Sequence, residues 1–233
     1  DDMHRTIRES NNKEFNERTS SESNEQKKLE NELEDTECEF QKRKYQEDII
    51  NFGNKKLREL NKFYLELATG GGKSYIAYKL LNLIKKNIII ILSPRKKINK
   101  QNGSEKNLSI LDSNYHLFNY STDINFEKWL CTHKNNKKII IACVQSQEKI
   151  YNIIIKNNLS DISIWFDEAH WSVENWCCDI HSLSKQFFIN DKTIIKKRLF
   201  TSASPDRNKI AYYPDVFGEV YCPFKVKELI NRE

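Results

Sequence analysis

The run Ala68-Thr69-Gly70-Gly71-Gly72-Lys73-Ser74 lies between an apolar segment, residues 63–67, and a helical pattern that starts near Ser74. Successive glycines allow backbone N–H groups to curl around an anion without clashes from Cβ atoms. A helix that follows directly aims the positive end of its dipole at the same point. The stretch therefore predicts a phosphate-binding loop. Thr69, Gly70, Gly71 and Gly72 supply backbone donors, Lys73 reaches the terminal phosphates, and the Ser74 hydroxyl ligates Mg²⁺.

A second motif follows at Ile162-Ser163-Ile164-Trp165-Phe166-Asp167-Glu168-Ala169-His170. The apolar run and its sharp switch to acidic residues predict a buried parallel strand with two carboxylates at its carboxyl end. Open α/β sheets bind their ligands at that end. Asp167 is expected to hold Mg²⁺, and Glu168 to orient or deprotonate an attacking water. Each motif alone is also typical of a plain loop or acidic turn, but the two in this order support each other.

The two motifs resemble the first motor domain of the superfamily 2 helicases in its DEAH spelling, a family that tolerates the loss of a glycine at the position of Leu67. The spelling favours the restriction-motor and repair-helicase branch over the RNA helicases. Five further segments resemble motifs of the same family and come in the family's order: Phe40–Gln46, Ile91–Arg95, Ile140–Ser146, Leu199–Pro205 and Val216–Val220.

The resemblance implies an α/β fold, a RecA-like P-loop sandwich of three layers around a mostly parallel sheet, with ATP and Mg²⁺ as ligands. It implies that Gln46 reads adenine, with Tyr45 stacking on the base. It also implies that His170, Thr201 and Ser202 couple the state of the bound nucleotide to the affinity for nucleic acid. Contacts to the nucleic-acid backbone would come from Pro94, Arg95, Gln145 and Ser146.

Several of these roles compete with purely structural ones. Gln46 also fits an amphipathic helix without a ligand, and His170 fits a half-buried histidine held by a hydrogen bond. Thr201 and Ser202 also fit the polar end of a strand. Trp171 could stack on a base, although a tryptophan at this position more often packs against the following helix.

The family's second motor domain has no counterpart in the chain, so we expect a fragment of a longer protein that hydrolyses ATP poorly by itself. In the family, that domain supplies an arginine that stabilises charge in the transition state. The function expected from the resemblance is an ATP-driven helicase or translocase that acts on nucleic acid, with DNA favoured over RNA. Two alternatives stay open: a nucleotide-dependent binding module or scaffold, and the motor part of a restriction-type nuclease.

Charge is spread unevenly along the 233 residues. Residues 1–37 hold six Lys/Arg and twelve Asp/Glu, a net charge of −6. Because the whole chain has a formal net charge of +5, residues 38–233 carry +11. A basic domain fits a nucleic-acid partner, but an A/T-rich genome would also enrich lysine along with asparagine and isoleucine. No run approaches the ~18–20 apolar residues of a membrane span. The six cysteines lack the spacing of a zinc site and indicate a reducing, intracellular compartment.

Two parts are expected along the chain: an acidic, flexible N-terminal extension over 1–37 and one ATP-binding domain over 38–233. In the second part, short β-rich runs alternate with helical patterns, which predicts a parallel sheet covered by helices on both faces. Lys137 and Lys138 are expected in a solvated turn. Strands are expected over 63–67, 88–92, 115–119, 139–144, 162–166 and 198–202, and helices over 41–51, 74–86, 95–101, 124–132, 146–157, 173–187 and 224–231.

Overall fold

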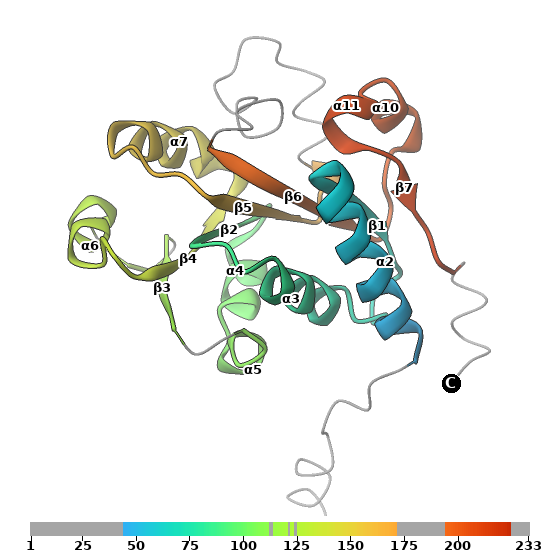
Figure 1. The fold of residues 1–233 in the computed structure, drawn as a ribbon, viewed down its shortest axis with the longest axis horizontal. Coiled ribbons are helices and arrows are strands. Elements are labelled where there is room, and N and C mark those ends of the chain that lie inside the picture. Colours follow the sequence, from blue (N-terminus) through green and yellow to red (C-terminus); the bar gives the residue numbers. More distant parts are fainter. Residues whose placement is uncertain (1–43, 112–113, 121, 124, 172–193, 225–233) are drawn as a thin grey trace, which may run out of the picture. The chain divides into compact units, whose positions relative to one another are not determined.

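Seven strands form one parallel sheet in the computed structural model, which describes residues 44–111, 114–120, 122–123, 125–171 and 194–224 (Figure 1). Their order across the sheet is β3-β4-β2-β5-β6-β1-β7, and each neighbouring pair runs parallel. The strands are β1 (Lys62–Glu66), β2 (Ile88–Ser93), β3 (Tyr115–Asn119), β4 (Lys137–Cys143), β5 (Ile162–Asp167), β6 (Ile195–Ser202) and β7 (Val220–Tyr221).

Helices cover both faces of the sheet, which gives the three layers that the sequence predicted (Figure 1). A short 3₁₀ turn, η1 (Val144–Ser146), joins β4 to the next helix. One face carries α2 (Lys44–Leu60), α3 (Lys73–Ile84), α4 (Lys96–Asn102) and α5 (Glu105–Leu108). The other carries α6 (Phe126–Thr132), α7 (Gln147–Lys156), α10 (Arg207–Ala211) and α11 (Pro214–Phe217).

The central strands are apolar on both sides because both sides are covered. Along β2, Ile88, Ile90 and Leu92 join the hydrophobic cluster that contains residues of α7. The side chains between them, Ile89 and Ile91, join the cluster that contains residues of α3. Successive side chains of a strand point to opposite faces, so one continuous apolar run supplies two cores.

The six predicted strands are confirmed, with ends that move by a few residues. The prediction of a solvated turn at Lys137 and Lys138 was wrong, because β4 begins at Lys137 and Lys138 is buried. The Lys138 ammonium donates to the carbonyl oxygens of Lys134 and Asn136, at 3.1 and 2.7 Å. These carbonyls allow a charged head group to be buried at the start of a strand.

The helix predicted over 41–51 continues much further, to Leu60. Gly53 lies inside α2, beyond the predicted end of the helix, and lets the helix approach the sheet. A Cβ added at Gly53 would lie 2.7 Å from Cε1 of Phe63 on β1. The expected extension over 1–37, the helix over 173–187 and nearly all of the helix over 224–231 lie outside the described residues.

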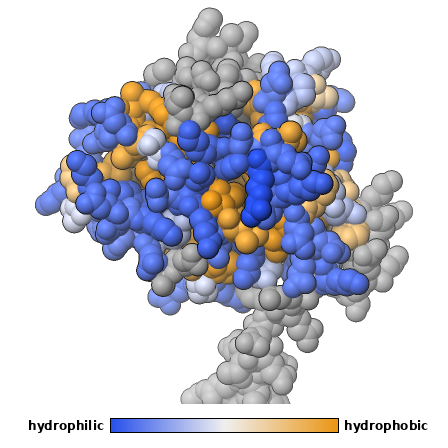
Figure 2. Space-filling model, in the orientation of Figure 1, coloured by the Kyte–Doolittle hydropathy of each residue, from blue (hydrophilic) through white to orange (hydrophobic). Residues whose placement is uncertain are grey.

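Hydrophilic side chains cover most of the face shown in Figure 2, with hydrophobic ones visible between them. Large apolar side chains that remain exposed in the described part of the chain include Trp171 and Tyr212, at 42% and 81% of their full accessibility. In the same part, no helix is both long and apolar enough to pass through a bilayer.

Candidate functional site

The glycine-rich loop joins β1 to α3 at the carboxyl edge of the sheet. Gly70 and Gly72 have positive φ angles of 83° and 85°, a conformation that glycine adopts without strain. A Cβ added at Gly70 would meet no atom within 4 Å, so open space borders the loop there. Gly72 is also the N-cap residue of α3, which directs the positive end of the helix dipole to the loop. Open space beside this helix end is suited to an anion.

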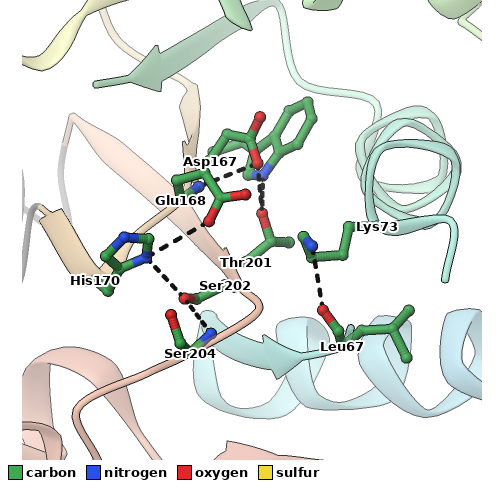
Figure 3. A network of polar contacts seen from close by, with 9 residues as sticks. Leu67, Lys73, Asp167, Glu168, His170, Thr201, Ser202 and Ser204 are labelled. Carbon is green, nitrogen blue, oxygen red and sulfur yellow. Dashed lines mark hydrogen bonds and ion pairs between the residues drawn. The ribbon is translucent and has the colours of Figure 1, made fainter. Parts of the chain in front are cut away.

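Lys73 and Ser74 begin α3 and are half-buried. The Lys73 ammonium donates a hydrogen bond to the carbonyl oxygen of Leu67 at 3.1 Å and so closes the loop on itself (Figure 3). Its charge also acts on Asp167, where it opposes the rise in the carboxyl pKa that burial causes. The loop after β1 and the acidic end of β5 are therefore close enough to share one ligand.

The start of α2 packs on the same loop. The Tyr45 hydroxyl donates to the carbonyl oxygen of Gly71 at 3.1 Å. A Cβ added at Gly72 would clash with Nε2 of the buried Gln46 side chain, and the positive φ of Gly72 also favours glycine there. Gln46 thus lies beside the glycine-rich loop, and its contact with adenine stays a prediction.

Asp167 ends β5 and accepts three hydrogen bonds. Its Oδ2 accepts from the Asn102 amide at 3.0 Å, and its Oδ1 accepts from the Thr201 hydroxyl and the Glu168 N–H, each at 3.1 Å. Burial raises the pKa of Asp167, while the bonds from Asn102 and Thr201 and the charge of Lys73 act against that rise. The carboxylate is held in one orientation by groups that favour its ionised form.

Glu168 has a left-handed backbone with φ of 51°, which is uncommon for a residue with a long side chain. Such a conformation costs of order 1 kcal/mol and often marks a functional site. It turns the Glu168 carboxylate away from the strand toward His170, whose Nδ1 lies 3.5 Å from Oε2 (Figure 3). The same Nδ1 lies 3.0 Å from the hydroxyl oxygen of Ser202.

Thr201 and Ser202 end β6, the strand that lies between β1 and β5. The Thr201 hydroxyl accepts from the Trp165 indole N–H at 2.8 Å and donates to Asp167. The Ser202 hydroxyl accepts from the backbone N–H of Ser204 at 3.1 Å and contacts His170, while the Ser202 carbonyl accepts from the Leu67 N–H at 3.0 Å. These two residues connect the glycine-rich loop to the acidic motif (Figure 3).

The residues predicted to contact a nucleic-acid backbone come from two neighbouring strand ends. Pro94 and Arg95 follow β2, Gln145 and Ser146 lie in η1 after β4, and β2 pairs with β4. Pro94, Gln145 and Ser146 border one cavity of about 320 Å³. Arg95 is exposed, and its guanidinium lies over the Trp171 ring.

Asn102 belongs to the site although its sequence pattern, Asn102-Gly103, indicates only a turn. Asn102 is buried under α3. Its backbone carbonyl oxygen accepts from the Tyr78 hydroxyl at 2.6 Å, and its side-chain amide donates to Asp167. No spacing rule connects a residue at the end of α4 with an acid 65 positions later. Only the packing of α4 against β2 and β4 brings them together.

A family model described as "Type III restriction enzyme, res subunit" matches residues 39–206. This range holds both loops of the site, and all of the described site residues lie within it. None of the curated proteins matches the chain.

Several solved structures share the fold. The type ISP restriction-modification enzyme LlaGI, as a nuclease-deletion mutant in complex with a DNA substrate mimic, is 17% identical with a TM-score of 0.60, over 82% of this chain and 20% of its own. The Hef helicase domain of Pyrococcus furiosus is 20% identical with a TM-score of 0.56, and the match covers 78% of this chain and 38% of the Hef chain. The UvsW helicase of bacteriophage T4 is 18% identical with a TM-score of 0.52, and the match covers 78% of this chain and 60% of the UvsW chain.

The chain thus spans between a fifth and three fifths of the length of these proteins. At these identities the likeness establishes the fold, and it confirms the predicted RecA-like sandwich. The sheet, which was predicted to be mostly parallel, is parallel at every described pairing.

Proposed function

Because the chain belongs to the family of the type III restriction enzyme res subunit, we propose that it is the first, ATP-binding motor domain of a superfamily 2 helicase or translocase. This motor couples ATP hydrolysis to movement on nucleic acid. One observation carries the proposal: Lys73, at the start of α3, acts electrostatically on Asp167 at the end of β5, next to Glu168 at the same edge of the sheet, and Thr201 of β6, the strand between β1 and β5, donates to Asp167. An edge that combines a lysine, two carboxylates and a helix N-terminus is suited to a nucleoside triphosphate.

The residues present fit ATP and Mg²⁺. Backbone groups from Thr69 to Gly72 would surround the phosphates, next to the open space at Gly70. The Lys73 ammonium would exchange the Leu67 carbonyl for a phosphate oxygen, which is the stronger partner because it is charged. The Ser74 hydroxyl and the Asp167 carboxylate would hold Mg²⁺, which neutralises phosphate charge when it is bound.

Glu168 would orient the attacking water and accept its proton. Its carboxylate faces away from β5 and lies within 3.5 Å of His170, so its position depends on the Ser202 hydroxyl that His170 contacts. Any shift of the end of β6 therefore reaches Glu168 through His170. This contact supports the predicted coupling role of His170, Thr201 and Ser202.

DNA is the proposed polymer along which the motor moves. LlaGI was solved with a DNA substrate mimic, and the related type ISP enzyme LlaBIII, 16% identical with a TM-score of 0.61, was solved bound to DNA. Contacts through Pro94, Arg95, Gln145 and Ser146 would reach the phosphate backbone, so binding would depend strongly on salt and little on sequence. Efficient turnover would also need a second motor domain that supplies an arginine.

The test is ATP hydrolysis by the natural, full-length protein with single-stranded DNA, duplex DNA and RNA, next to a Glu168→Gln variant. Stimulation by one polymer that disappears in the variant, while ATP still binds, is the expected result and identifies the track. ATP binding with no stimulated turnover on any polymer would contradict the motor and favour a nucleotide-dependent scaffold.

A further inference from the structure

Three adjacent strands end around the cavity that Pro94, Gln145 and Ser146 border. Lys96 follows β2, Cys143 ends β4, and Tyr120 comes directly after β3, the edge strand next to β4. The cavity measures about 320 Å³, which is at the small end of the range of roughly 300–1,000 Å³ that is typical of small-molecule sites. Its contents would lie beside the predicted backbone contacts, and none of the predicted roles uses Tyr120 or Cys143.

Tyr120 is fixed by ring contacts with the hydrophobic core and by a backbone hydrogen bond. Its ring makes edge contacts with Phe118 and Phe126, with centroid distances of 5.9 and 5.6 Å. Its backbone N–H donates to the Ile141 carbonyl at 2.8 Å, which continues the pairing of β3 with β4 past the end of the strand. Burial raises the pKa of the Tyr120 hydroxyl, so the ring stays uncharged at physiological pH. A fixed, neutral aromatic ring that remains half-exposed is suited to stacking.

The cavity combines apolar and polar groups in the way that a nucleobase requires. Tyr120, Pro94 and Cys143 line the cavity and have side chains suited to contact a flat ring, while Gln145 and Ser146 line it and have side chains able to form hydrogen bonds to the edge of a base. Lys96 adds positive charge at the same cavity, and Arg95, Lys97 and Lys100 are exposed nearby on the same segment. This charge favours a ligand that carries phosphate over an apolar peptide.

We propose that this cavity binds one unpaired nucleobase of the nucleic-acid strand, stacked on Tyr120. The inference rests on the proposed function and adds that the nucleic acid bound at this point is unpaired. A base in the cavity cannot remain paired, so the motor would hold a single strand, or a base turned out of a duplex, at this point. Binding would then depend on the presence of bases, although little on their identity.

The test compares two ligands of equal length at constant salt, oligothymidylate and a fully abasic deoxyribose-phosphate oligomer, with the natural full-length protein. Wild type should bind the abasic oligomer at least about fivefold more weakly, which corresponds to the lower end of base-stacking energies. Tyr120→Ala should bind both ligands equally, and Tyr120→Phe should keep the preference because it keeps the ring. Arg95→Ala, the matched control for a backbone contact, should weaken both ligands by the same factor.

Equal affinity of wild type for the two ligands would overturn the base site, and this result needs no variant to fold. The motor proposal would survive it if nucleic acid still stimulates hydrolysis. A Tyr120→Ala variant that keeps the full preference would also overturn the assignment, because the bases would then bind elsewhere. As an independent readout, photocrosslinking with 5-iododeoxyuridine should label a peptide that contains Tyr120, and labels confined to other peptides would count against the site.

Discussion

The guanidinium of Arg95 lies 6.0 Å from the centroid of the Trp171 ring, at a distance suited to a cation–π contact. The two residues belong to different parts of the proposed machine. Arg95 is the N-cap residue of α4 and a predicted contact for the nucleic-acid backbone, while Trp171 directly follows His170 and lies with its ring 5.9 Å from the His170 ring. The backbone N–H of Trp171 donates to the backbone carbonyl of Glu168 at 3.2 Å. The Trp171 side chain thus contacts Arg95, which follows β2, and His170, which follows β5.

Replacing Trp171 by alanine should weaken the link between nucleic-acid binding and hydrolysis. Because an exposed cation–π contact is worth ~0.5–1 kcal/mol, the stimulation of ATP hydrolysis by nucleic acid should fall about two- to fivefold. The basal rate should stay unchanged, since the variant leaves Lys73, Asp167 and Glu168 intact. Steady-state hydrolysis with and without saturating nucleic acid measures both quantities.

Trp171→Phe should retain most of the stimulation because it keeps a ring under Arg95. Tyr212→Ala is a matched control, since Tyr212 is an exposed aromatic residue outside the site and its loss should have no effect. Equal stimulation in wild type and Trp171→Ala would show that the contact with Arg95 carries no signal.

Lys73→Ala should abolish function at little cost in stability. Within the described residues, the Lys73 ammonium donates one hydrogen bond, to the Leu67 carbonyl, so its loss should change the free energy of unfolding by about 1 kcal/mol or less. Hydrolysis should fall by at least ~10²-fold, as when one preorganised donor to a developing charge is removed. Calorimetric titration with Mg-ATP and hydrolysis assays measure the loss. Lys79→Ala on the same helix is the control and should bind ATP normally.

The sequence predicted the parts of the site that depend on local chemistry. Glycines before Lys73 and acids after the apolar run at 162–166 have few structural alternatives, and a parallel sheet brings the ends of strands to one edge. The roles of Pro94, Gln145 and Ser146 came from resemblance, and the pairing of β2 with β4 explains why they lie together.

Features that depend on packing between distant elements could not be predicted. Gly53 looks like the end of a helix, but it allows close contact with Phe63. Asn102 ends an ordinary helix and Tyr120 follows an ordinary strand. Only the tertiary fold places Asn102 against Asp167 and Tyr120 at the cavity that Pro94 borders. β7 has only two residues and exists because β1 offers an edge for pairing.

Asp167→Asn should stabilise the protein while it removes the metal-binding carboxylate. The buried Asp167 carboxylate is costly, as its raised pKa indicates. An asparagine amide would find a partner, because Oδ1 of Asn102 is buried without a hydrogen bond and can accept after the Asn102 amide turns. We expect a melting temperature higher by about 2–4 °C, which corresponds to ~1 kcal/mol in a domain of this size. Added Mg-ATP should raise the melting temperature of wild type but not of the variant.

The stabilisation should depend on pH with a definite sign. A carboxyl group whose pKa is higher in the folded than in the unfolded state costs nothing below the unfolded pKa of ~3.9, where both states are protonated. The cost grows as the pH rises from there through the raised folded pKa. The advantage of Asp167→Asn should therefore be absent well below pH 4 and full at neutral pH, as urea unfolding at several pH values would measure. A constant advantage would show that charge burial is not its cause.

Thr201→Val should destabilise the domain through a different residue, Trp165. The Thr201 hydroxyl accepts from the Trp165 indole N–H and donates to Asp167, and all three side chains are buried. Valine keeps the shape but leaves the indole N–H without a partner, which costs roughly 1–3 kcal/mol. Urea unfolding followed by tryptophan fluorescence measures this loss. Thr201→Ser keeps the hydroxyl and should recover most of the stability, despite the small cavity left by the missing methyl group. If serine and valine destabilise equally, packing of that methyl group, and not the hydrogen bonds, holds β6 against β5.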